Sequence, residues 1–255
     1  MSGQARSAAA GDEFFVGYAR APSSIKSYVA KAVVITLVFV FVIGFALAWS
    51  VQERGGGGFG GGLKVRGQVA NLPYPVIQIF PSKAYPKGHV MLIAGGGKQG
   101  MGPVVEKLKG KAVEARGFLL KRGDLDVIVT DTPGHYKVVS EAPANGPLKP
   151  VSLGKWRIAG EICDGKCYAG VMRPGTGIAH KACANVCIAG DQPAVFATVR
   201  PVQGASFLLL ADSQGKIPPK VMYDYVALPV ELEGELVRYG DLLVLKADWS
   251  KVVRQ

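Results

Sequence analysis

The chain has 255 residues, of which 34 are Gly, 16 are Pro and 19% are charged, and its formal net charge at neutral pH is +11. This length allows one large domain or two small ones, and the many Gly and Pro residues exclude a simple helix bundle and favour a turn-rich β protein. A basic excess attracts acidic proteins, anionic lipid or nucleic acid, although a solvated basic surface without a partner has the same composition.

Residues 32–51 form an uncharged run of 20 residues, AVVITLVFVFVIGFALAWSV. A helix of that length rises about 30 Å, which is the thickness of one hydrocarbon core. The sequence therefore predicts an N-terminal tail over 1–31 and a transmembrane helix over 32–51. A cleaved signal peptide is the alternative, because Ala46-Leu47-Ala48 resembles a cleavage site, but the long leader that contains acidic residues argues against it.

The orientation of this helix is not determined by charge, because basic residues flank it in similar numbers on both sides. All four cysteines follow the helix, and disulfides persist only in oxidising compartments. We expect the tail 1–31 in the cytoplasm and the rest of the chain, after the helix, outside the cytoplasm.

The remaining chain divides into a glycine-rich linker and a β domain. The linker is predicted over 52–63 and contains GGGGFGGG, a composition typical of flexible tethers. The β domain is predicted over 64–255. Short apolar runs bounded by Gly and Pro predict strands at 74–80 and 89–94, and short helices are expected at 103–109 and 178–188.

An internal repeat lies within this domain. Residues 113–131 and 230–248 align without a gap, with nine of nineteen positions identical. Each copy reads as a strand, a Gly-Asp turn and a second strand, with Gly117 or Gly234 marking a bend in the first strand. A bent strand running into a hairpin is typical of five-stranded Greek-key barrels of the OB type. We expect a mainly β fold: an OB-like barrel, or two related β units, with one or two short helices.

The segment 95–100, GGGKQG, fits the G-x-G-x-x-G pattern of dinucleotide-binding turns. The predicted helix after it is short and no βαβ alternation follows, so we interpret the segment as a glycine turn before a short helix. A weaker hypothesis is that backbone N–H groups beside Lys98 hold an anion.

The most informative feature is a cysteine-rich insert over 160–190. It contains every cysteine of the chain and one of its three histidines, in the order Cys163, Cys167, His180, Cys183 and Cys187. On the predicted helix, the last three of these residues lie at i, i+3 and i+7, which places them on one face. The first two flank the turn 164–166, so all four sulfurs are expected to converge.

Three interpretations of the insert stay open. Two disulfides would tie the loop to the helix, as Cys163–Cys187 and Cys167–Cys183 or in the crossed pairing, each contributing about 2–4 kcal/mol. All four cysteines, or three of them with His180, would instead bind zinc, or an iron–sulfur centre. The third interpretation is thiol redox chemistry, with the thiolate favoured by nearby basic groups at Lys166, Arg173, His180 and Lys181.

Two stretches of the chain carry a resemblance, namely Gly97-Lys98-Gln99-Gly100 after an apolar strand and EICDGKCYAGVMRPGTGIAHKACANVCIAG over 161–190. With these stretches, most of residues 88–195 resembles a family of bacterial membrane-anchored proteins that has no assigned activity. The resemblance implies a bacterial inner (plasma) membrane origin and implies no mechanism. With the orientation expected above, the C-terminal domain is predicted to be periplasmic or otherwise extracytoplasmic.

Our leading hypothesis for function is a binding or scaffold module rather than an enzyme, with a disulfide-stapled cluster and no cofactor. It would be an accessory subunit of a membrane complex, such as a respiratory or other redox assembly. Its expected partners are the lipid bilayer, through 32–51, and an acidic protein or membrane protein; nucleic acid is not expected. The candidate contacts to an anionic partner are Lys98, Lys166, Arg173 and Lys181. The alternative is a metal-binding or thiol-redox protein that uses the same cysteines and His180.

Overall fold

The structure is a computed structural model, and it describes residues 23–50, 56–139 and 146–255. The chain forms two units, residues 1–53 and 54–255. In the first, helix α1 (Ser23–Ser50) covers residues 32–50 of the uncharged run and begins nine residues before it. Its segment Ile25–Ala48 has a mean hydropathy of 2.6 and is long enough to cross a membrane. Length and composition suit this segment to a membrane anchor or a signal sequence alike.

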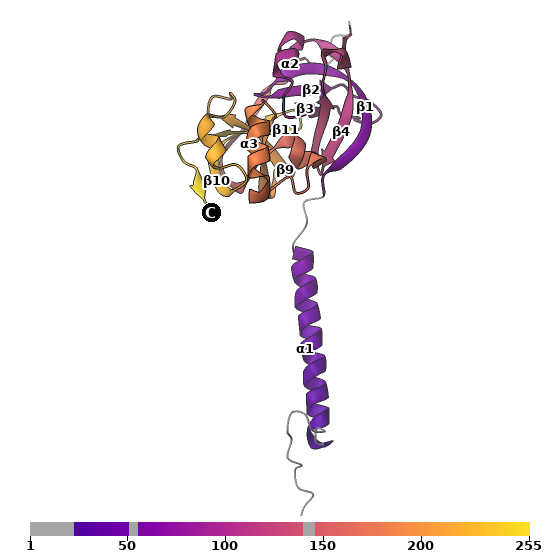
Figure 1. Cartoon of the computed structure of the whole chain (residues 1–255), viewed down its shortest axis with the longest axis vertical. Helices are drawn as coiled ribbons and strands as arrows, with labels where there is room; N and C mark the ends of the chain where they lie inside the picture. The colour runs from indigo at the N-terminus through magenta and orange to yellow at the C-terminus, as the bar shows by residue number, and fades with distance from the viewer. Residues whose placement is uncertain (1–22, 51–55, 140–145) are drawn as a thin grey trace, which may run out of the picture. The chain divides into compact units, whose positions relative to one another are not determined.

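The second unit contains a five-stranded barrel, barrel 1, in its N-terminal half (Figure 1). Its elements are β1 (Gly58–Asn71), β2 (Pro75–Ile79), β3 (His89–Gly95), α2 (Gly102–Leu108), β4 (Ala112–Arg122) and β5 (Leu125–Thr130), followed by η1 (Pro133–His135) and β6 (Tyr136–Val138). The strands pair in the order β1-β2-β3-β5-β4 and β4 pairs back with β1, so the sheet closes. Only the β3–β5 pair is parallel, and β6 is an additional strand beside β4.

The C-terminal half repeats this topology as barrel 2. Its elements are β7 (Pro150–Asp164), η2 (Cys167–Val171), η3 (Ile178–His180), α3 (Lys181–Ala189), β8 (Ala194–Val202), β9 (Ala205–Asp212), η4 (Lys220–Asp224), β10 (Pro229–Tyr239), β11 (Leu242–Ala247) and β12 (Val253–Arg254). The order β7-β8-β9-β11-β10 closes through the β10–β7 pair, and β9–β11 is again the parallel pair. The prediction of a mainly β, OB-like fold is confirmed, and two related barrels account for the internal repeat.

The glycine-rich segment differs from its prediction as a linker. Strand β1 begins at Gly58, so residues 58–63 belong to the barrel, where they pair with residues 117–121 of β4. Glycine has a low intrinsic strand propensity, and here the closure of the barrel overrides it. The part of the predicted linker over 52–55 lies outside the described residues.

The repeated glycines have the same structural reason in both barrels. A Cβ at Gly117 would collide with the carbonyl oxygen of Val129, and a Cβ at Gly234 would collide with that of Lys246. These two carbonyls are themselves 117 positions apart, like the glycines. The first strand of each repeated hairpin therefore bends so closely over its partner that no side chain fits.

The repeated aspartates join the two barrels reciprocally. The carboxylate of Asp241, in the β10–β11 turn, accepts the Val90 N–H at 2.8 Å and lies 2.5 Å from Nδ1 of His89 in barrel 1. The equivalent Asp124, in the β4–β5 turn, accepts the Ser206 N–H at 3.2 Å in barrel 2. His89 and Ser206 are again 117 positions apart, so the contact between the barrels has the reciprocity of a twofold-symmetric dimer interface.

The Asp241 contact predicts an acid-dependent component of stability. Burial raises the pKa of Asp241, but the hydrogen bond and charge of His89 and the Val90 N–H outweigh it, so the pKa is lowered. A lowered folded-state pKa stabilises the fold above the unfolded value of about 4, and this stabilisation is lost as the pH falls through the folded value. We expect urea unfolding to show a steeper loss of stability between pH 5 and pH 3 in the native chain than in Asp241→Asn. Adding His89→Gln to the Asp241→Asn variant should not change the pH dependence of its stability further. An equal pH dependence in the native chain, the single variant and the double variant would contradict this role of Asp241.

Candidate functional site

The cysteine-rich insert connects β7 to β8 in barrel 2. Asp164 ends β7, and its Oδ1 accepts the backbone N–H of Cys167 at 2.8 Å, which starts the short helical turn η2. The chain then returns through η3 and α3. Gly190, which follows α3, accepts the Gly100 N–H at 2.6 Å, and a Cβ at this position would collide with the carbonyl of Lys98. The insert is thus held at both ends, by barrel 2 at Asp164 and by the glycine turn of barrel 1 at Gly190.

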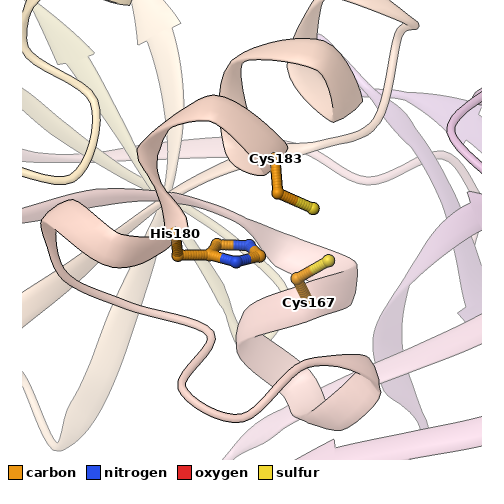
Figure 2. A group of neighbouring side chains, drawn as sticks. All are labelled: Cys167, His180 and Cys183. Atoms are coloured by element: carbon orange, nitrogen blue, oxygen red, sulfur yellow. The ribbon is translucent and has the colours of Figure 1, made fainter.

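Five side chains of the insert converge, with Cys167 at their centre. The ligand atoms of Cys167, His180 and Cys183 lie within 4.8 Å of one another (Figure 2), and so do those of Asp164, Cys167 and Cys187. Cys183 is partly exposed, whereas the other four residues are buried. The predicted single face of His180, Cys183 and Cys187 therefore does point at Cys167.

Asp164 is the member of this group that the sequence analysis missed. It is completely buried, and its Oδ2 lies 3.2 Å from Nε2 of His180. The available signal was strand alternation: successive residues of a strand point to opposite faces, so Asp164 and Cys163 cannot both face the insert. A carboxylate within the Cys163–Cys167 spacing was therefore itself a candidate.

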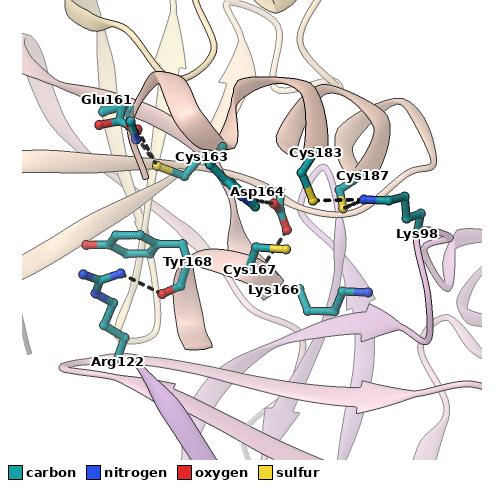
Figure 3. Close-up of polar contacts among 12 residues, drawn as sticks. Lys98, Arg122, Glu161, Cys163, Asp164, Lys166, Cys167, Tyr168, Cys183 and Cys187 are labelled. Atoms are coloured by element: carbon teal, nitrogen blue, oxygen red, sulfur yellow. Dashed lines mark hydrogen bonds and ion pairs between the residues drawn. The ribbon is translucent and has the colours of Figure 1, made fainter. Parts of the chain in front are cut away.

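Cys163 does not join the other cysteines, which corrects the expected convergence of four sulfurs. Its Sγ is turned toward Glu161, 3.6 Å from Oε1 and 3.9 Å from the backbone oxygen (Figure 3). Burial, together with the charge of Glu161, raises the pKa of this thiol well above its usual range. All four cysteines are free thiols, so the structure does not confirm the predicted disulfides.

The sulfurs of Cys167 and Cys187 lie within 4.8 Å of each other, and the two thiols differ in acidity. Interaction with the Cys167 thiol lowers the pKa of Cys187, against the opposing effect of burial, and the charges of Lys98 and Lys166 lower it further. The same interaction, with burial, raises the pKa of Cys167. The geometry therefore favours a thiolate at Cys187, which is the form that binds metals and attacks disulfides.

Lys98 reaches the sulfurs of α3 from barrel 1. Its Nζ lies 3.0 Å from Sγ of Cys183 and 3.6 Å from Sγ of Cys187 (Figure 3). The hydrogen bond to Cys183 is the main cause that raises the pKa of Lys98. Lys98, in the G-x-G-x-x-G segment, therefore places its ammonium group beside two sulfurs. The hypothesis of an anion site beside Lys98 stays a prediction.

The three other basic residues proposed for partner contacts also donate within the chain. Lys166 is buried, and its Nζ donates to the carbonyl oxygen of Gly95 at 2.9 Å and to that of Gly97. Arg173 donates to the Gly57 oxygen at 2.9 Å, and Lys181 to the Asp224 oxygen at 2.8 Å. The glycine turn therefore uses its carbonyl groups to bind a lysine of the insert.

Replacing Lys166 with Met should lower the free energy of unfolding by about 1–3 kcal/mol, because two carbonyl oxygens of the glycine turn lose a charged donor. Urea unfolding of the purified chain measures this. Lys155→Met is the matched control, because Lys155 is exposed on β7 and its loss should change stability by less than about 0.5 kcal/mol. Equal losses in the two variants would show that the buried ammonium adds no stability of its own.

Comparison with protein-family models, with curated proteins and with solved structures finds no match to this chain.

Proposed function

We propose that the chain is a membrane-anchored module whose insert binds one thiophilic metal ion, Zn²⁺ before others, through Cys167, His180, Cys183 and Cys187. The observation that carries the proposal is the convergence of three sulfurs, an imidazole and a buried carboxylate, with the Cys167 sulfur common to both groups. Three thiolates and one imidazole form a familiar closed tetrahedral zinc set. Ligands at zinc lie roughly 3.5–3.8 Å apart. The two groups that share Cys167 each lie within 4.8 Å, so side-chain rotations would bring Cys187 to the same ion as His180 and Cys183.

Asp164 fits the role of an outer partner in this site. A metal-bound histidine commonly donates its second ring N–H to a carboxylate, which fixes the tautomer and the orientation of the ring. The 3.2 Å contact between Nε2 of His180 and Oδ2 of Asp164 supplies that arrangement and leaves Nδ1 for the ion. Complete burial of Asp164 would keep this orientation rigid.

The charge around the sulfurs also supports the proposal. Three thiolates and one divalent ion carry a net charge of −1, and Lys98 on two of the sulfurs offsets it. A site with four protein ligands leaves no open position for a substrate, which favours a structural role over catalysis. The ion would hold η2, η3 and α3 together and so preserve the contact of the insert with the glycine turn.

The proposal also includes the location of the protein and its role in a larger complex. Helix α1 would anchor the protein in a bacterial inner membrane with the barrels outside the cytoplasm, as an accessory subunit of a membrane complex. Coordination would protect buried thiolates from oxidation in such a compartment. A second candidate is thiol redox chemistry, which the closeness of the Cys167 and Cys187 sulfurs and the lowered pKa of Cys187 favour.

The test is the metal content and the intact mass of the full chain, purified in detergent without chelator. We expect one zinc per chain and no mass loss from disulfide formation. Exchange of zinc for Co²⁺ should give the thiolate-to-metal absorption of a tetrahedral sulfur-rich site. A metal-free protein that is two mass units lighter, with Cys167 and Cys187 in one disulfide-linked peptide, would support the redox candidate in place of the metal site. Four free thiols with no bound metal after zinc addition would refute the metal site.

A further inference from the structure

A second surface of the molecule combines exposed aromatic rings with a row of cations, on the outer face of barrel 1. Residues of β1 and β4 that are paired across the ladder point to the same side of the sheet, and the two strands lie side by side (Figure 1). Val65 and Ala115 belong to the barrel core, so their neighbours Lys64 and Arg116, which are paired with each other, point outward. Phe118, paired with Gly62, lies on this same outer face.

The aromatic part lies near the beginning of β1. Phe59 is 70% exposed and Phe118 is 60% exposed. Phe59 pairs with Leu120, two residues after Phe118 on the outer face, so the two rings are diagonal neighbours. Gly62 beside them has nothing within 4 Å of a Cβ position, so no side chain of the described chain covers this position. Two neighbouring phenylalanines that face solvent mark an interaction site more often than a single exposed apolar residue does.

The cationic part follows directly along the same strands. Lys64, Arg66 and Arg116 surround one carboxylate, Glu114, at 3.1–3.4 Å, and Lys137 of β6 pairs with Glu114 across the ladder. The side chains of the three surrounding cations are 56–64% exposed, whereas that of Glu114 is only 7% exposed. Four cations against one carboxylate leave a local net charge of +3.

We infer that this face, which comprises Phe59, Phe118, Lys64, Arg66, Arg116 and Lys137, docks on the anionic headgroups of the bilayer that holds helix α1. Aromatic rings enter the headgroup boundary and nearby Lys and Arg residues bind anionic lipid, so the pattern on the face matches a membrane surface. The length of the chain supports the same occupant. Phe59 follows Ala48, the end of the apolar span, by eleven residues, so it lies within about 40 Å of that point even in a fully extended chain. The inference rests on the proposed membrane anchor.

The experiment uses the full chain reconstituted as one copy per nanodisc, in phosphatidylcholine and in a mixture with phosphatidylglycerol. Hydrogen exchange of the peptides that contain 58–66 and 116–122 should be slower in the anionic discs, and high salt should remove the difference. Phe59→Ser with Phe118→Ser, and separately Lys64→Glu with Arg116→Glu, should abolish the protection. Lys155→Glu with Arg200→Glu is the matched control, with two exposed cations of barrel 2 reversed and protection retained.

Vesicle binding separates this inference from the anchor. If the chain does not enter nanodiscs, the anchor is refuted, and co-sedimentation with phosphatidylglycerol vesicles then tests the face alone. Each lysine or arginine at an anionic surface contributes about fivefold in affinity, so the Lys64→Glu and Arg116→Glu pair should weaken vesicle binding at least about 25-fold. The inference would be overturned if hydrogen exchange is equal in both kinds of nanodisc and the chain does not bind vesicles. It would also be overturned if protection appears only with two copies per disc, which would assign the face to self-association.

Discussion

Replacing Cys167 with serine should abolish stoichiometric zinc binding, and it is the substitution with the largest expected effect on the proposed site. Cys167 belongs to both converging groups, so its loss leaves the ligands of α3 and the Asp164–His180 pair without a common centre. Loss of an outer partner alone typically weakens metal binding by about 10–100-fold, so loss of this ligand should weaken it by more than about 100-fold. Competition with a chromophoric chelator measures the affinity directly.

Cys163→Ser is the matched control for this prediction, because it makes the same chemical change in the same insert, four residues before Cys167. The Cys163 sulfur faces Glu161, so the zinc stoichiometry and affinity should stay at the native value. Asp164→Asn should fall between the two, with a loss of about 10–100-fold, since it keeps the shape but weakens the support of His180. Equal zinc loss in the Cys163 and Cys167 variants would contradict the assignment of ligands.

Replacing either repeated glycine with alanine should destabilise the fold strongly. A Cβ at Gly117 or Gly234 would overlap the backbone of the neighbouring strand, and backbone cannot move aside as a flexible side chain can. Overpacking of this kind costs about 1–3 kcal/mol, which for a protein of this size corresponds to a fall of roughly 2–12 °C in the melting temperature. Thermal unfolding followed by circular dichroism measures both variants.

Gly62→Ala provides the comparison for these glycine variants. Gly62 also lies in a bent, glycine-rich strand, but nothing lies within 4 Å of its Cβ position and its backbone is not in the left-handed region. Its melting temperature should therefore stay within about 2 °C of the native value, because surface substitutions usually change stability by less than 0.5 kcal/mol. A fall as large as that of Gly117→Ala would show that glycine flexibility, and not close strand approach, explains the repeated glycines.

The local elements were accessible from the sequence because they depend on short-range patterns. The uncharged run, the apolar stretches at 74–80 and 89–94, and the short helices at 103–109 and 178–188 match α1, β2, β3, α2 and η3 with α3. The repeat 113–131/230–248 identified the same hairpin in two related units, because equivalent strand contacts impose equivalent residues. The shared face of His180, at the end of η3, with Cys183 and Cys187 of α3 followed from helical periodicity alone.

Only the tertiary structure decided which groups meet. Closure of barrel 1 recruits the glycine-rich residues 58–63 as strand, although their composition is that of a tether. Strand alternation at the end of β7 sends Cys163 to Glu161 and Asp164 to His180, and this depends on the pairing partner of β7. The contact of Lys98 with Cys183 joins residues 85 positions apart in two different barrels. Such contacts depend on strand register and barrel closure, which are set by packing over the whole unit and leave no short-range pattern in the sequence.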